Sequence, residues 1–202
     1  MKTINFLFGL SMLSMVACKK EKDPTEDEPG SNKKLTEIVA QAYLDEAKKM
    51  GFTVHTGNNP PDIGGEYLLA PWRFDAHNDP STYGEPGSVH QGGFRLQVLY
   101  EQSGGEIWVN FNGYFQGDSD LSKPFIIGSG NNFTICRHRY GTGGTGANFG
   151  FPFVFLVSGT KDGNELKNVK MATIRLKSES PYAVDEKVGQ ITIYSDADGV
   201  SQ

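Results

Sequence analysis

After residue 51 the chain alternates between short hydrophobic runs and clusters of turn-forming residues. The runs are rich in β-branched and aromatic residues, and Gly, Asn, Asp and Pro separate them, which is typical of an all-β domain. The expected strands lie near 65–74, 94–101, 106–115, 125–127, 132–140, 149–158, 166–177 and 187–195. Because many of the links are short, consecutive strands should be antiparallel neighbours.

About eight sequential antiparallel strands predict an up-and-down β-barrel. Closing the sheet into a barrel removes the exposed strand edges that would otherwise invite aggregation. A β-sandwich of two sheets is the alternative, because the same number of strands permits it.

One amphipathic helix is predicted between residues 34 and 50. Its apolar residues recur at spacings of three and four. Lys48 and Lys49 occupy the last turn, and Gly51 follows as a C-terminal stop. The strand over 151–157 carries apolar residues on both faces, so it needs cover on both sides. The helix is the expected cover, either across an outer face or over an open end.

The first residues predict export and a lipid anchor. Lys2 precedes an uncharged stretch, 4–16, which is too short to span a membrane and suits a signal peptide. The sequence Met-Val-Ala-Cys at 15–18 resembles the lipobox of bacterial lipoproteins. This resemblance implies cleavage before Cys18 and lipidation of its thiol, with 1–17 as the signal peptide. A buried N-terminal helix or an ordinary secretory peptide is the alternative.

Residues 18–32 are expected to form a flexible tether after the lipidated cysteine. The segment 19–32 carries eight charged residues and no hydrophobic one, so it cannot bury enough apolar surface to fold. Its charged cluster resembles the export tags of surface lipoproteins from Bacteroides-like bacteria. The resemblance implies a lipid-anchored protein of the outer membrane facing outward, whereas a plain spacer would face the periplasm. Residues 33–202 then form a single β-rich domain.

Charge and cysteine content exclude two further classes of protein. The chain has 19 Lys and Arg against 24 Asp and Glu, a net charge of −5, which argues against a nucleic-acid partner. If Cys18 is lipidated, Cys136 is the one remaining cysteine, so no intramolecular disulfide is possible. The strand-like surroundings of Cys136 favour a buried, inert thiol.

Two segments resemble a group of uncharacterised lipoproteins from Bacteroides-like gut bacteria. They are GFTVHTGNNPPDIGGEYLL at 51–69 and YSDADGVS at 194–201. The resemblance implies a β-rich, lipocalin-like domain, and it brings no known activity. The Gly-Glu-Tyr step at 65–67 is also similar to the Gly-x-Trp that begins lipocalin-type barrels.

The strand near 132–140 carries the first candidate ligand site. Phe133 and Ile135 share a face with Arg137 and Arg139, so an apolar stripe becomes cationic along the strand. If that face points into the barrel, the two guanidinium groups would hold an anionic or hydroxyl-rich ligand. The alternative is that both side chains extend into solvent.

Aromatic residues suggest a second candidate site. Trp72 and Arg73 lie close to the long connection 75–93, and connections of that length are often functional. Trp72 would stack on a sugar or an apolar ligand, with structural packing as the alternative. Trp108, which alternates with Ile107 and Val109 along its strand, is a further candidate.

No motif indicates an enzyme, a cofactor or a metal. The run 141–146 matches G-x-G-x-x-G, but a strand-like segment follows it, so a hairpin loop is expected. The turn at 196–199 has only part of a calcium-binding loop, and the four histidines lack metal-ligand spacing. We therefore expect a non-enzymatic binding module for a small molecule or glycan. The alternative is a structural or protein-interaction lipoprotein without a ligand pocket, and the sequence leaves the oligomeric state open.

Overall fold

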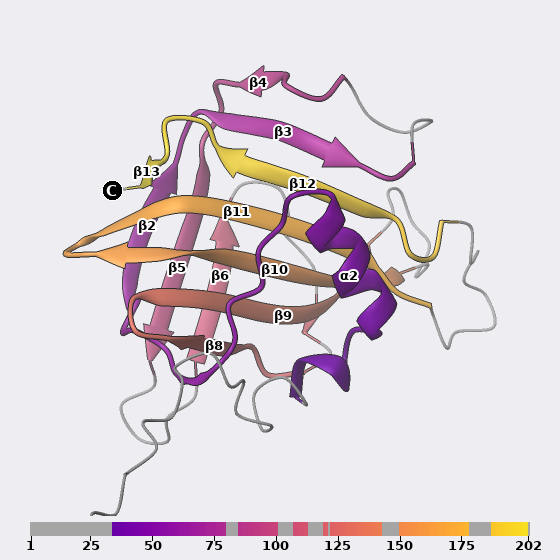
Figure 1. Cartoon of the computed structure of the whole chain (residues 1–202), viewed down its shortest axis with the longest axis horizontal. Helices are drawn as coiled ribbons and strands as arrows, with labels where there is room; N and C mark the ends of the chain where they lie inside the picture. Colours follow the sequence, from indigo (N-terminus) through magenta and orange to yellow (C-terminus); the bar gives the residue numbers. More distant parts are fainter. Residues whose placement is uncertain are drawn as a thin grey trace, which may run out of the picture.

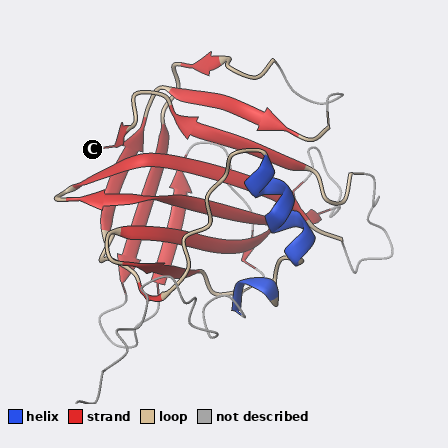
Figure 2. Ribbon diagram, in the orientation of Figure 1, coloured by secondary structure: helices blue, strands red, loops and turns tan. Residues whose placement is uncertain are grey.

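The computed structural model describes residues 34–79, 85–100, 107–112, 119–120, 122–142, 150–177 and 187–201. Within these ranges most residues lie in strands, and the strands form two sheets (Figures 1 and 2). The small sheet contains β2 (Gly65–Leu69), β5 (Phe94–Tyr100) and β6 (Ile107–Asn112). The large sheet contains β1 (Asn58–Asn59), β3 (Trp72–His77), β4 (Val89–His90), β7 (Ser119–Asp120), β8 (Phe125–Ser129), β9 (Asn132–Thr142), β10 (Gly150–Asp162), β11 (Glu165–Arg175), β12 (Ile191–Asp196) and β13 (Val200–Ser201).

The middle of the large sheet is an antiparallel meander. Strands β8, β9, β10, β11 and β12 follow one another in sequence and pair with their neighbours, so this part of the prediction is confirmed. The full order is β1-β8-β9-β10-β11-β12-β3-β4, with β13 beside β11 and β7 beside β9. Because β1 pairs with β8 in parallel, the sheet is mixed, whereas the prediction had antiparallel strands throughout.

The described strands form two separate sheets, and no closed barrel is found among them. In Figure 1 the strands of the small sheet run crosswise behind those of the large sheet, as in orthogonal sheet packing. The strand expected at 65–74 is two strands, one in each sheet. Pro71 stands between them, and proline has no N–H to donate to a sheet ladder, so the first strand ends there.

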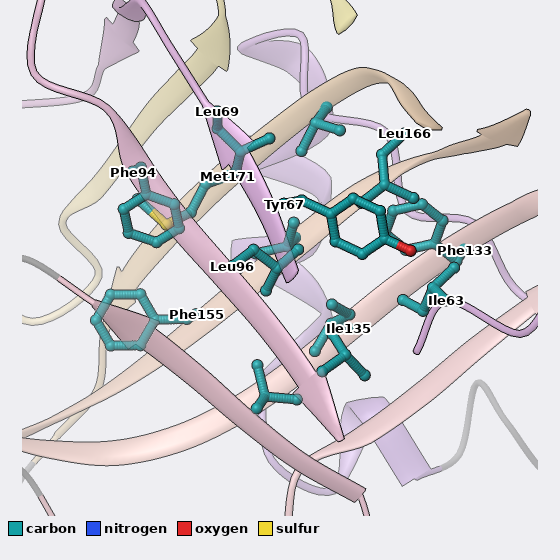
Figure 3. Close-up of a cluster of buried hydrophobic side chains, with 14 of the residues drawn as sticks. Ile63, Tyr67, Leu69, Phe94, Leu96, Phe133, Ile135, Phe155, Leu166 and Met171 are labelled. Atoms are coloured by element: carbon teal, nitrogen blue, oxygen red, sulfur yellow. The ribbon is translucent and has the colours of Figure 1, made fainter. Parts of the chain in front are cut away.

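The two sheets enclose a filled apolar core, the intersheet core. Figure 3 shows side chains from β2 and β5 meeting side chains from β9, β10 and β11. The buried members are Ile63, Tyr67, Leu69, Trp72, Phe94, Leu96, Val98, Val109, Phe133, Ile135, Phe155, Val157, Leu166, Val169 and Met171. Because this core is continuous, burial of apolar surface holds the sheets together.

A second core covers the opposite face of the large sheet, the helix side. Helix α2 (Gln41–Lys49) and the residues around it supply Leu35, Val39, Leu44, Ala47 and Phe52. Strands of the large sheet supply Phe125, Ile127, Cys136, Val154, Leu156, Ala172, Ile174, Ile191 and Ile193. Strand β10 therefore has apolar cover on both faces, and the helix covers one of them (Figure 2), as predicted.

The predicted helix over 34–50 is shorter than expected. A single helical turn covers 34–36, and α2 begins at Gln41 because Ala40 has an extended conformation with ψ of 137°. The C-terminal stop is confirmed. Gly51 has φ of +94°, and the Phe52 N–H donates to the Ala47 carbonyl, which closes the helix as glycine-ended helices commonly do.

The long connection predicted at 75–93 is partly folded. Strand β3 extends to His77, and β4 returns to pair with the start of β3. Residues 80–84 lie outside the described ranges. The described part of the chain contains no helix long and apolar enough to cross a membrane.

Candidate functional site

The predicted cationic face of β9 points into the space between the sheets. Phe133 and Ile135 belong to the intersheet core. Arg137 and Arg139 follow on the same face, because every second residue of a strand projects to the same side. The inner face of the large sheet therefore changes from apolar to cationic along β9.

Strand register places two aromatic rings and a third arginine beside these residues. Arg137 pairs across the ladder with Phe155 on β10. Arg139 pairs with Phe153, which pairs in turn with Arg175 on β11. Two arginines thus flank one phenylalanine in a row across three strands. We call Arg137, Arg139, Arg175, Phe153 and Phe155 the arginine–aromatic face.

Arg137 and Arg139 are deeply buried. Their exposed fractions are 8% and 5%, so the alternative that both extend into solvent is wrong. Both have interaction partners within the protein, and the backbone of Asp120 pairs with that of Arg139. A buried guanidinium is costly unless acceptors or negative charge surround it. This end of the intersheet space is therefore suited to negatively charged or acceptor-rich groups.

Trp72 lies on the intersheet side but is packed as a core residue. Its ring stacks on Phe94 at a centroid distance of 5.3 Å and on Tyr194 at 5.8 Å. The exposed fraction of Trp72 is 7%. With aromatic partners on two sides, its ring contributes to packing, and the geometry favours the structural alternative over ligand stacking.

Arg73 lies on the other face of the large sheet, away from the arginine–aromatic face. Its Nε donates to Asp75 Oδ1 at 2.7 Å, and Ser195 Oγ donates to the same oxygen at 3.0 Å. Lys170 Nζ lies 3.9 Å from Asp75 Oδ2 and also donates to the Gly51 carbonyl, next to α2. Arg73 is thus part of a polar network on the helix side.

Two other predicted residues cannot be placed as site residues. The backbone of Trp108 pairs with Leu99 in the small sheet, but its side chain lies outside the described part of the structure. Cys18 and the whole of 1–33 also lie outside the described ranges.

The C-terminal turn at 196–199 is held by its own hydrogen bonds. Asp198 Oδ1 accepts from the Val200 N–H at 3.0 Å, and Asp196 Oδ2 accepts from Ser201 Oγ at 2.8 Å. No group of three or more potential metal ligands occurs among the described residues. Burial raises the pKa of Asp196, the hydrogen bond from Ser201 opposes this shift, and the neighbouring Asp198 carboxylate adds to it.

This shift predicts a pH-dependent effect of Asp196→Asn on stability. Because the folded-state pKa of Asp196 is raised, its contribution to stability is fully present below the unfolded-state pKa. It is lost as the pH rises through the folded-state pKa. At pH 7 the variant should therefore be more stable than the wild type, and this advantage should shrink toward about pH 4. Urea unfolding across that range measures it, and an advantage that grows in acid would contradict the assignment.

Cys136 has the environment of a structural thiol. It is buried in the helix-side core, and this burial raises its pKa to about 12 against an opposing effect of Lys34. A thiol of this kind is neither a nucleophile nor a metal ligand at neutral pH. His138 lies on the same strand face, and burial lowers its pKa. The prediction of a buried thiol is confirmed.

Sequence reasoning missed two features near the surface of the intersheet core. The first is Arg175, which joins the arginine–aromatic face because it pairs with Phe153 on β10. The signal that could have found it is alternation along β11, since Arg175 is four residues after the buried Met171 and so lies on the same face. The second feature is a pocket of about 320 Å³ beside strand β8, near the β1 end of the large sheet. It is lined by Pro60, Pro61, Asp62, Tyr100 and Ile126.

Comparisons with family models, with curated proteins and with solved structures found no significant match. The resemblance to Bacteroides-type lipoproteins therefore stays a prediction.

Proposed function

We propose that this protein is a lipid-anchored, non-enzymatic binding module of the cell envelope. The anchor would be a lipid on Cys18, which tethers the β-rich domain to the outer membrane. The ligand would be a small anionic molecule or an acidic glycan held at the arginine–aromatic face. A lipocalin-like closed barrel stays a prediction, and the proposal does not depend on it, because two packed sheets already place Arg137 and Arg139 on an inner face.

One observation carries the ligand assignment: two arginines are buried beside phenylalanine rings on an inner face of the large sheet. Arg137 and Arg139 are two residues apart on β9, so their Cα atoms are roughly 7 Å apart on the same side of the strand. Guanidinium groups at this spacing can bond one carboxylate, phosphate or sulfate group together. Phe153 and Phe155 alongside them supply the apolar wall of a typical ligand site.

Thermal unfolding with small anions tests this assignment. The full chain, purified in a detergent without sugar or choline groups, is heated with inorganic phosphate, glucuronate or neutral glucose. A ligand at about 100 times its Kd adds about 2.7 kcal/mol of stability. That corresponds to a rise in Tm of roughly 5–10 °C for a chain of this size. We expect phosphate or glucuronate to produce such a rise through this face, and we expect glucose to produce none that depends on Arg137 and Arg139.

Variants separate a ligand role from a structural one. Arg137→Met with Arg139→Met keeps side-chain length and removes both charges, and apolar replacement of buried charges is often tolerated. The double variant should retain its circular dichroism spectrum and lose the anion-dependent rise in Tm. Arg95→Met is the matched control, because Arg95 is half-exposed on the small sheet and pairs with Glu66. An equal rise in the double variant, or none in the wild type, would overturn the assignment.

A second candidate function has one observation in its favour. Leu68 and Leu99, on the outer face of the small sheet, have exposed fractions of 48% and 50%. Exposed apolar residues together with a filled core are features of a protein-interaction module. If Leu68→Ser with Leu99→Ser abolishes self-association or partner capture while the anion response is absent from the wild type, this alternative replaces the first.

A further inference from the structure

The pocket beside Tyr100 is lined by other residues than those of the arginine–aromatic face. Tyr100 is the last residue of β5, and Ile126 is on β8. Pro60, Pro61 and Asp62 connect β1 to β2 and complete the lining. Ile126 pairs with Ile135 on β9, which is two residues from Arg137 and four from Arg139, so the two arginines lie roughly 7 and 13 Å further along that strand. The pocket is therefore a separate candidate site.

The Tyr100 ring is held in place by the backbone of the segment that leads into β2. Its Oη accepts a hydrogen bond from the Ile63 N–H at 3.2 Å. Burial raises the pKa of the Tyr100 hydroxyl, the hydrogen bond from Ile63 opposes this shift, and the nearby Asp62 carboxylate adds to it. Gly64 packs against the ring so closely that a Cβ there would lie 2.9 Å from Cε2. These contacts fix the ring before any ligand arrives, which lowers the entropic cost of binding.

Much of this fixed ring remains open to solvent. The exposed fraction of Tyr100 is 41%, which makes it one of the few large apolar side chains exposed among the described residues. Pro60 and Pro61 add two rigid apolar rings that have no N–H groups to satisfy. The pocket thus offers flat apolar surface in a restrained arrangement.

The polar chemistry of the pocket comes from Asp62. Its Oδ1 accepts from the Gly64 N–H at 2.9 Å, which orients the carboxylate. An ionised carboxylate only accepts hydrogen bonds, so it selects hydroxyl or amine donors and repels anions. Among the described lining residues none is cationic. A ligand here needs donors, an apolar face and no negative charge.

We propose that this pocket binds a neutral pyranose sugar, stacked on Tyr100 and hydrogen-bonded through its hydroxyls to Asp62. The axial C–H groups of a pyranose ring carry slight positive charge and suit the electron-rich face of an aromatic ring. The pocket is wide open to solvent, and its volume of about 320 Å³ lies at the small end of the range for ligand sites, as suits a single small ligand. A quaternary ammonium ligand would require enclosure by several aromatic rings, and Tyr100 is the one aromatic residue among the lining residues that the structure describes.

The test titrates the full chain with methyl glycosides of glucose, galactose and mannose, and with tetramethylammonium as the cation probe. Protein-observed NMR follows the Tyr100 ring protons and the Ile126 methyl groups in a detergent that lacks sugar and choline groups. We expect at least one methyl glycoside to shift both sets of signals with a common saturation curve. If only tetramethylammonium shifts these signals, the proposal is overturned. It is also overturned if none of the probes shifts them.

Variants provide a second readout. Tyr100→Ala should weaken glycoside binding at least tenfold, and Asp62→Asn severalfold, whereas Tyr100→Trp should retain it. Leu99→Ala is the matched control, because Leu99 is the preceding residue on the opposite face of β5 and is exposed to a similar extent. Unchanged affinity in folded Tyr100→Ala would overturn the proposal. The titration of the wild type gives the answer even if that variant does not fold. Arg137→Met with Arg139→Met should leave glycoside binding unchanged, so this proposal and the proposed anion site fail independently.

Discussion

Replacing Leu96 with alanine should lower the free energy of unfolding by about 2–5 kcal/mol. Leu96 has an exposed fraction of 0% and lies on the inner face of β5, within the intersheet core (Figure 3). Removing its branched side chain leaves a cavity between the two sheets, and the crossed strands around it restrict relaxation. Urea unfolding of the purified variant and wild type measures the difference.

Leu99→Ala is the control for this prediction, since Leu99 lies on the outer face of the same strand with half of its surface exposed. Its effect should stay within about 0.5 kcal/mol. A shift of the β5 register by one residue would exchange the two faces. A larger loss from Leu99→Ala than from Leu96→Ala would therefore contradict the arrangement of the small sheet.

The second large effect concerns the proposed lipid anchor. In a bacterial host, the wild-type chain should incorporate radiolabelled palmitate and sediment with membranes, and Cys18→Ala should do neither. Each buried CH₂ group of an acyl chain contributes about 0.8 kcal/mol of membrane binding, so the loss of several chains leaves the protein without a stable anchor.

Cys136→Ala is the matched control for the anchor, because it removes the other cysteine of the chain. Cys136 is buried in the helix-side core, so this variant should keep both the label and the membrane association. Palmitate on the Cys18→Ala protein, or none on the wild type, would show that Cys18 is not the lipidation site.

The strands and their faces were largely predictable, because alternation is a local property of the chain. The run from Phe151 to Val157 has apolar residues on both faces, and the structure covers both. The change from Phe133 and Ile135 to Arg137 and Arg139 was visible in the same way. The depth at which the arginines are buried was not, since it depends on strands that are distant in sequence.

The pairing of the strands required information that local patterns lack. Pro71 divides one apparent strand between two sheets, and β3 returns to pair with β12 near the end of the chain. Arg175 reaches the row of Arg139 only through the register of β10. The pocket at Tyr100 arises because the segment that leads into β2 packs against the end of β5, a contact between residues 37 positions apart.

The most direct test of the arginine–aromatic face is the NMR signal of each arginine side-chain Nε–H during titration with inorganic phosphate or glucuronate. The account predicts that the signals of Arg137 and Arg139 shift together along one saturation curve, while those of Arg73 and Arg95 stay in place. Saturable shifts confined to Arg73 and Arg95, or no saturable shift of any arginine signal, would contradict it.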